Sequence, residues 1–299
     1  MTTPGVLPPP ADTAMPVARQ RGGRPRVRRL RQRPRALFIV LLVISIAMML
    51  PLLILLITSV TPGAQLDADK WLPAVFRWSN YRDALSGIPF WHYARDSLFL
   101  SVVYAGLTTL SSALVGYGFA RLRGPGKNML FGVLIAMMIV PQIVTLIPTY
   151  LLFSRVHLVG TYWPWFIWGS AGAPYAIFLY RQFFSSFPRE LEEAAEIDGA
   201  GRLRTFLTIF LPLSRPLLVT AFVLAFNATW GDYIAPTLFL NQNNTTLAAG
   251  LASGYFSSQN IPEPTVLAAG TFLYIIPVVV LFLLAQRHYV RGFINSGLK

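Results

Sequence analysis

The sequence predicts an all-α, polytopic membrane protein with six transmembrane helices and a short cytoplasmic helix between the fourth and the fifth. Of its 299 residues, 54% are hydrophobic and 12% are charged, about half the charged share of soluble domains. Six stretches reach the roughly 20 apolar residues that a membrane-crossing helix needs. They are residues 36–66, 97–120, 128–154, 156–180, 216–240 and 264–286, and Asp232 is the only Asp, Glu, Lys or Arg within them.

The chain begins with a basic tail, residues 1–35, which carries nine arginines. We expect this tail to be disordered, because it offers almost no apolar side chains to a core. The first apolar run is too long for a signal peptide and lacks an evident cleavage site, so we interpret it as a retained first span. Residues 36–299 are then predicted to form one membrane domain.

Basic residues are distributed unevenly between the two sides of the predicted membrane. Twenty of the 25 lysines and arginines lie in the tail, after the second and fourth spans, or after the last span. Cytoplasmic loops carry such an excess, so both termini and the connection 181–215 are expected in the cytoplasm. The net charge of +13 follows from this topology, and no nucleic-acid partner is needed to explain it.

Small residues and prolines punctuate the predicted spans. Thr108, Ser112, Gly116 and Ala120 recur at helical spacing in the second span and predict the close approach of another helix. Prolines lie within the spans at positions 51, 141, 148, 174, 236 and 277. Each removes a backbone donor, so we expect kinks whose free carbonyls find partners in neighbouring helices or water.

The connection between the fourth and fifth spans is unusually acidic. Its acidic residues are Glu190, Glu192, Glu193, Glu196 and Asp198. Pro188 suits the first turn of a helix, the first acids complement the positive end of its dipole, and Gly199 can end it. We therefore predict a helix over residues 188–198. A second helical stretch from Arg202 should end at Leu211–Pro212, where the proline bends the chain toward the fifth span.

Taken alone, this helix leaves two interpretations open. Leu191, Ala194 and Ala195 share one face at helical spacing, but alanines bury little surface of their own. Glu192 and Glu196 are four residues apart and repel each other unless a positive charge lies between them. The helix is then either a docking surface for another protein or an ordinary solvated helix balanced by Arg202 and Arg204.

The spacing of residues 193–212 resembles the signature of binding-protein-dependent ABC importer permeases. That signature is Glu-Ala-Ala, three residues, Gly, nine residues, Ile, one residue, Leu-Pro. It is met in this chain by Glu193, Ala194, Ala195, Gly199, Ile209, Leu211 and Pro212. The segments FNATWGDYIAPTLFL and QRHYVRGFINSGLK extend the similarity to carbohydrate-importer permeases of the maltose/maltodextrin type, over most of residues 36–299.

This resemblance implies that the acidic helix is the coupling helix, which docks on a cytoplasmic ATPase subunit. The implied docking residues are Glu190, Glu192, Glu193, Ala194, Ala195, Asp198 and Gly199, with Glu193 and Gly199 the most important. The implied partners are a second homologous permease, two copies of the ATPase and an extracytoplasmic solute-binding protein. The implied location is the lipid bilayer of a bacterial inner membrane.

The sequence contains no motif for chemistry of its own. GPGKN at residues 124–128 lacks the spacing and the Ser or Thr of a phosphate-binding loop, so ATP and Mg²⁺ are expected on the ATPase subunit. The three histidines are scattered without metal-ligand spacing, and the chain has no cysteine. We therefore expect a non-enzymatic subunit with no catalytic residue, metal site or cofactor.

Asn227, Trp230 and Asp232 form the candidate substrate pathway, because an amide, an aromatic face and a carboxylate can hold sugar hydroxyls. A di- or oligosaccharide is implied by the resemblance, and a glycerol phosphate remains open. The family commonly has an amide at the position of Gly231, which makes a sugar contact there an open question. Asp232 is equally compatible with the outer interface, with pairing to another subunit, or with an ion site in a gradient-driven carrier. A membrane scaffold that recruits a partner through the acidic helix is a further alternative.

Overall fold

The computed structural model of this protein describes residues 34–66 and 72–296. The chain divides into two units, residues 1–49 and 50–299. Helix α1 (Pro34–Ser59) begins in the first unit and ends in the second. The basic tail was predicted to be disordered, and its residues 1–33 lie outside the described ranges. Within those ranges the regular structure is helical, apart from an isolated bridge between Phe256 and Pro262, which confirms the all-α class.

The second unit contains thirteen further α-helices among its described residues. They are α2 (Ser79–Gly87), α3 (Phe90–Arg121), α4 (Lys127–Met137), α5 (Gln142–Arg155), α6 (Trp163–Ala171), α7 (Pro174–Ser185), α8 (Glu190–Ile197), α9 (Arg202–Thr205), α10 (Leu211–Leu213), α11 (Arg215–Trp230), α12 (Ile234–Phe239), α13 (Leu247–Ala252) and α14 (Pro264–Ser296). A 3-10 turn, η1 (Gly63–Gln65), follows α1, and a turn of π-helix, η2 (Phe206–Phe210), joins α9 to α10.

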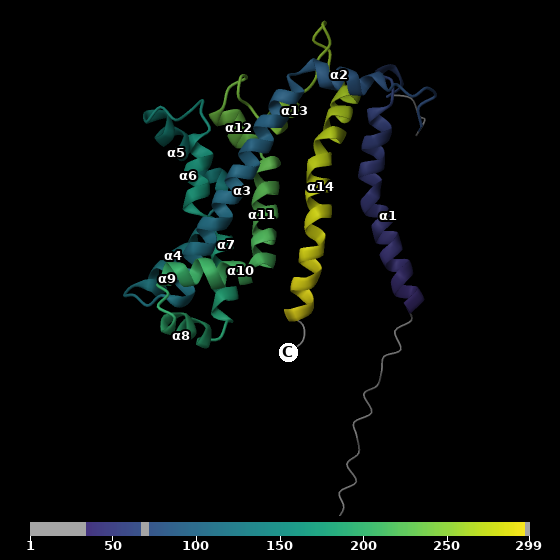
Figure 1. Cartoon of the computed structure of the whole chain (residues 1–299). Coiled ribbons are helices and arrows are strands. Elements are labelled where there is room, and N and C mark those ends of the chain that lie inside the picture. The colour runs from purple at the N-terminus through teal and green to yellow at the C-terminus, as the bar shows by residue number, and fades with distance from the viewer. Residues whose placement is uncertain (1–33, 67–71, 297–299) are drawn as a thin grey trace, which may run out of the picture. The chain divides into compact units, whose positions relative to one another are not determined.

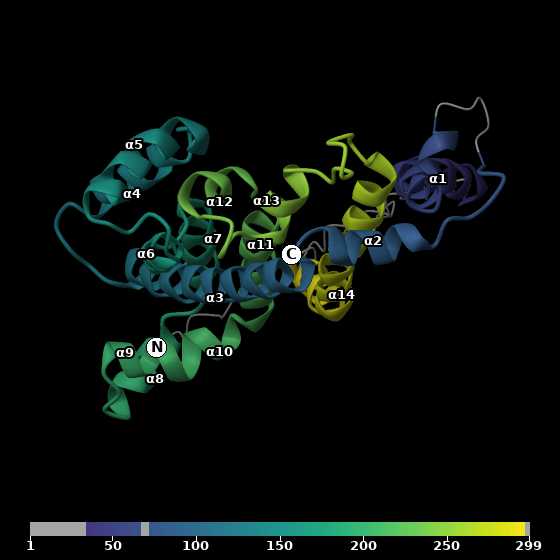
Figure 2. The same ribbon diagram turned by 90° about the horizontal axis from the view of Figure 1, so that it is seen from above.

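Helix α3 is the centre of the second unit and packs against α6, α7 and α11 (Figure 1). Helix α14 packs against α11 and α2, and α13 contacts α3 near its start. Helices α8, α9 and α10 lie at the same end of this unit as the C-terminal end of α14, while α2, α12 and α13 lie at the opposite end. Seen from above, α8 to α10 project beyond one side of α3 (Figure 2).

The described residues include three single helices that are long and apolar enough to cross a membrane: Leu37–Ser59, Phe90–Arg121 and Pro264–Gln286. Two further candidates are bent pairs. The pair α4 and α5 bends by 102°, and Arg202–Leu213 bends by 81° against Arg215–Trp230. The prediction of six spans is therefore confirmed only in part. The described residues give three candidate spans, or up to five if each bent pair is counted as one span. The second bend confirms that the chain turns near Pro212 toward the fifth span.

The predicted span over 156–180 is not one helix. The chain forms two shorter helices there, α6 and α7, with a break at Gly172 and Ala173. Gly172 has a φ of +77°, in the left-handed region that glycine tolerates. Pro174 follows as the first residue of α7 and has no backbone N–H to continue the ladder of α6.

Two adjacent serines of α3 satisfy the backbone at this break. The hydroxyl of Ser111 donates to the carbonyl of Gly169 over 2.9 Å. The hydroxyl oxygen of Ser112 accepts from the N–H of Ala173 over 3.0 Å. Backbone groups freed inside an apolar layer need such partners, so α3 is what makes the break tolerable.

The small residues of the second span serve helix packing, as predicted. A Cβ atom at Gly116 would lie 2.5 Å from the Cβ of Tyr180 on α7. Thr108 and Ser112 on the same stripe are buried. The missing side chain of Gly116 therefore allows α3 and α7 to pack backbone to backbone.

Candidate functional site

The acidic segment forms helix α8, which begins at Glu190, two residues after the predicted start. Pro188 lies before the helix, and the carbonyl of Arg189 accepts from the N–H groups of Glu192 and Glu193 over 2.9 and 3.1 Å. The first turn carries Glu190, Glu192 and Glu193. Their negative charge complements the positive end of the helix dipole, as the sequence predicted.

Gly199 ends this helix in the predicted left-handed conformation, with a φ of +72°. The N–H of Gly199 donates to the carbonyl of Glu196 over 3.0 Å, and the N–H of Ala200 donates to that of Ala195 over 2.9 Å. This pair of bonds is the Schellman arrangement, which satisfies the last carbonyls of a helix. A Cβ at Gly199 would meet no atom of this chain within 4 Å, so only the backbone conformation favours glycine within the protein.

The two faces of α8 differ from the predicted pattern. Ala195 is buried and Leu191 is half-buried, so these two residues, four apart, form the inner face. Ala194 was predicted to share that face and is instead exposed. The inner face is therefore narrower than predicted.

The outer face of α8 combines acids with a small and a large apolar residue. Its exposed members are Glu190, Glu193, Ala194, Glu196, Ile197, Asp198 and Gly199. Ile197 is 86% exposed, and Leu203 on the neighbouring α9 is 61% exposed. We did not single out these two apolar residues from the sequence, although an isoleucine among cytoplasmic acids was a usable signal. Together they supply apolar area that a bound protein would remove from water.

Glu192 is the one acid of α8 that turns inward. Its Oε1 lies 3.1 Å from Nε of Arg121, the last residue of α3, and the two side chains are 27% and 8% exposed. The negative charge at Glu192 is thus met by Arg121, which the sequence reasoning missed, and not by Arg202 or Arg204, which the solvated-helix alternative would use. This ion pair joins α8 to the end of the central helix.

A polar cleft of about 590 Å³ lies beside this ion pair. It is bounded by the end of α3, the end of α7, and helices α8 and α9. Its charged lining includes Arg123, Arg189, Arg202, Glu193 and Glu196. The inner side of α8 is therefore reached by solvent next to the ion pair.

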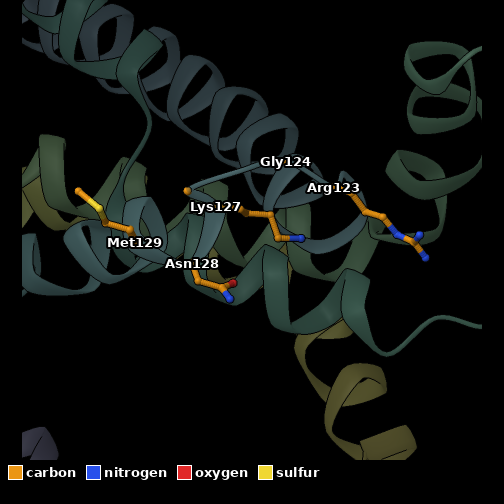
Figure 3. A pocket seen from close by; sticks show the side chains of 6 residues that line it. Arg123, Gly124, Lys127, Asn128 and Met129 are labelled. Atoms are coloured by element: carbon orange, nitrogen blue, oxygen red, sulfur yellow. The ribbon is translucent and has the colours of Figure 1, made fainter.

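A second, shallower hollow of about 320 Å³ lies in the connection between α3 and α4. The side chains of Arg123, Lys127, Asn128 and Met129 point in different directions there (Figure 3). The amine of Lys127 donates to the carbonyl of Leu122 over 2.7 Å. These groups do not converge on one point, and within residues 34–66 and 72–296 no group of three or more His, Asp or Glu is placed to hold a metal ion.

The structure gives the three candidate pathway residues different environments. Asn227 is exposed on α11. Trp230 is 2% exposed, because its ring is stacked between Phe226 and Tyr274 with centroid distances of 5.7 and 5.3 Å. Both faces of the Trp230 ring are occupied, so in this conformation it offers no face to a sugar.

Asp232 lies outside the helix in which the sequence placed it. Helix α11 ends at Trp230, so Asp232 lies in the connection between α11 and α12 and not within a helix. The Oδ1 of Asp232 accepts from the N–H groups of Ile234 and Ala235 over 2.9 and 3.1 Å. Its carboxylate therefore caps the start of α12, where the free N–H groups of a helix need acceptors.

Comparison with known proteins identifies the family. Residues 112–294, more than half of the chain, match the family described as binding-protein-dependent transport system inner membrane component. The chain belongs to this family of importer permeases. The matched region contains α8 and the whole 193–212 signature, so the resemblance seen in the sequence is confirmed.

Relatives of this permease include sugar-transport permeases. The arabinooligosaccharides transport system permease protein AraQ of Halalkalibacterium halodurans is 30% identical over 256 residues, which cover 83% of this permease and 90% of AraQ. The maltodextrin transport system permease protein MdxG of Bacillus subtilis is 34% identical over 213 residues, or 70% of this permease and 75% of MdxG.

The fold of the permease is also found in a solved importer. A chain of a bacterial ABC transporter involved in the import of the acidic polysaccharide alginate superposes with a TM-score of 0.74. The match covers 86% of this permease and 96% of that chain, at 21% sequence identity. It shows that the described helices are arranged in the ABC-importer permease fold.

Proposed function

We propose that this permease forms half of the translocation pathway of an ATP-driven importer for a di- or oligosaccharide. An extracytoplasmic solute-binding protein delivers the sugar, and a second homologous permease supplies the other half of the pathway. The observation that carries the proposal is α8, which with Gly199 at its end places Glu193, Ala194 and Gly199 of the family signature on an exposed acidic surface. The sugar class is supported by the named substrates of AraQ and MdxG.

The docking partner of α8 is a cytoplasmic ATPase subunit, present in two copies that hold the ATP and Mg²⁺. The outer face offers Glu190, Glu193 and Asp198 for charge-assisted hydrogen bonds to basic groups of that subunit. Ala194 and Gly199 permit close approach, and Ile197 supplies an apolar contact. Glu192 and Ala195 contribute from the inner side by holding the helix in place. Closure of the ATPase pair on ATP would displace α8 and switch the pathway between its two openings.

The permease lies in the bacterial inner membrane with α8 and both termini in the cytoplasm. This orientation is supported by the excess of lysine and arginine on that side. It agrees with the position of α8 and the end of α14 at one end of the second unit (Figure 1).

The pathway residues have separate roles in this proposal. Asn227 faces outward from α11 and contacts the sugar directly. Trp230 holds α11 against α14, because the hydroxyl of Tyr274 donates to its carbonyl over 2.6 Å. Asp232 sets the start of α12 beside the pathway. The carboxylate of Asp232, the candidate ion site of a gradient-driven carrier, serves here as a helix cap.

Purification of the tagged permease from its own membranes, with mass spectrometry of what accompanies it, tests the docking proposal. We expect an ATPase subunit and a second permease to co-purify with the wild type. Glu193→Lys and Gly199→Arg should lose the ATPase, because they reverse a charge and place a long side chain on the outer face of α8.

Asp83→Lys is the matched control for the charge reversal. Asp83 lies on α2, at the opposite end of the unit, and pairs with Arg77 over 3.3 Å in a half-exposed ion pair. Such pairs contribute about 0–1 kcal/mol, so this variant should keep the ATPase. A wild-type permease that purifies alone, under mild conditions that keep other membrane complexes together, would refute the docking role of α8.

A further inference from the structure

Arg121 occupies a junction between four segments of the permease. Its Nη2 donates to the carbonyl oxygens of Phe184 and Phe187, both over 2.6 Å, where α7 ends. Its Nε faces Glu192 on α8. Its guanidinium carbon lies 5.2 Å from the centre of the Phe210 ring, in the η2 segment that leads to α11.

Arginine is the side chain suited to such a junction. Its planar guanidinium carries five donors in a fixed fork, so one group can serve carbonyls, a carboxylate and a ring face together. The carbonyls of Phe184 and Phe187 lie at and just beyond the end of α7, where the regular ladder of helix hydrogen bonds stops, and Arg121 donates to both. Because only 8% of the Arg121 side chain is exposed, its charge requires these partners. The ammonium group of lysine is a single point charge and cannot contact the two carbonyls, the carboxylate and the aromatic ring together.

An aromatic cluster continues from this junction into the core. The ring of Tyr117 on α3 lies 4.9 Å from that of Phe210 and 5.2 Å from that of Phe206, between ring centres. Phe184 on α7 lies 5.6 Å from Phe210. The end of α3, the end of α7 and the η2 segment are therefore packed as one block. Arg121 is attached to this block on one side and to α8 on the other.

The contact of α8 with this block is narrow. The polar cleft opens beside the ion pair and is lined by both Arg121 and Glu192. The inner face of α8 has only Ala195 buried. The ion pair between Arg121 and Glu192 is therefore a main contact that holds α8 against the end of α3, because no wide packed interface joins them.

We propose that Arg121 is a positioning residue that transmits displacement of α8 to α3 and to the η2 segment before α11. This inference rests on the proposed docking of α8 on an ATPase subunit. When that subunit moves α8, the ion pair and the two carbonyl bonds carry the movement into the spans. Without Arg121, α8 stays docked but moves independently of α3.

The test measures the distance between spin labels on α8 and α3 in the assembled importer, without nucleotide and with ATP–Mg²⁺ trapped by vanadate. Because the chain has no cysteine, Glu196→Cys and Leu114→Cys label only these positions of the permease. Both side chains are exposed. The permease that carries only these two cysteines is called the background. It is compared with the same permease carrying Arg121→Met, Arg121→Lys or Glu192→Gln. The control is Arg123→Met, which changes an exposed arginine two residues after Arg121.

We expect one narrow distance in both states for the background and for Arg123→Met. Arg121→Met should lose this narrow peak when ATP binds, and Arg121→Lys and Glu192→Gln should broaden it. The ATPase subunit should still co-purify with each variant, which a general folding defect would prevent. Should Arg121→Met not assemble, Glu192→Gln decides alone, because it leaves the carbonyl bonds of Arg121 intact.

The two proposals fail in different ways. An unchanged narrow peak in the assembled Arg121 and Glu192 variants would overturn the role of Arg121 and leave the docking of α8 standing. A permease that brings down no ATPase subunit, in the wild type as well as the variants, would overturn the docking itself.

Discussion

Single residues of the α8 region have roles set by backbone conformation and by charge. Gly199 is needed for its positive φ, and Glu192 for its ion pair with Arg121. Glu193, next to it, is exposed and remains available to a partner. Of these two adjacent acids, Glu192 is thus engaged within the permease, while Glu193 is exposed.

Substitution of Gly199 separates the backbone requirement from the docking requirement. Gly199→Ala places a Cβ in the left-handed region at a cost of roughly 1 kcal/mol, whereas Gly199→Asn is better tolerated there. Because the site is open within the chain, no clash adds to this cost. We expect hydrogen exchange of the Ala200 amide to speed up by about fivefold in Gly199→Ala, since 1.4 kcal/mol corresponds to tenfold. Equal protection in the alanine and wild-type permeases would contradict the strained helix end.

Helices of this permease are joined by breaks whose free backbone groups are satisfied by side chains of α3 or of the connection itself. The break between α6 and α7 depends on Ser111 and Ser112 of α3, and that between α11 and α12 on Asp232. The bend before α11 follows a π-helical turn and Pro212. Short, bent helices of this kind suit a pathway that must open, because hinges lie where the regular hydrogen bonds stop.

Substitution of Gly116 tests whether α3 and α7 pack as closely as the structure shows. Gly116→Ala puts a methyl group 2.5 Å from the Cβ of Tyr180 and should cost about 1–3 kcal/mol by overpacking. Gly118→Ala is the control, because its Cβ would lie 3.9 Å from Leu122 Cδ1, an ordinary contact. We expect the midpoint temperature of unfolding in detergent to fall for Gly116→Ala only. A similar midpoint for both variants would mean that α3 and α7 can separate freely.

The second unit as a whole has two chemically different ends. At one end, the segment 190–205 of α8 and α9 exposes four acids and two arginines to solvent. The opposite end presents aromatic side chains such as Trp78 and Trp91, which are 66% and 70% exposed. Tryptophan is enriched at membrane interfaces and lysine and arginine at the cytoplasmic side, and we propose on the count of basic residues that the end with α8 faces the cytoplasm.

Single cysteines test this orientation in intact cells, since the natural chain has none. We expect Trp91→Cys to react with a membrane-impermeant maleimide from outside. Arg123→Cys, in the connection that follows α3 and outside the outer face of α8, should react only after the membrane is permeabilised. Both positions are exposed in the structure, so burial does not explain a difference between them. The opposite labelling pattern would reverse the assignment of α8 to the cytoplasm.

Features that depend on neighbouring residues could be read from the sequence. They include the apolar spans, the acidic start of α8, its end at Gly199 and the bend at Pro212, because dipoles, φ angles and missing N–H groups act locally. The family signature is equally local, which is why it identified the permease before the structure was known.

Features that depend on packing could not be read in this way. The break within 156–180 is stable because α3 brings two serines to it, and a hydropathy pattern does not reveal such distant partners. The ring of Trp230 is stacked on that of Tyr274 in α14, a contact that residue spacing along α11 does not reveal. Arg121 meets Glu192 only once α3, α7 and α8 are assembled. Tertiary contacts between residues far apart in the chain select these partners, and local propensity is too weak to specify them.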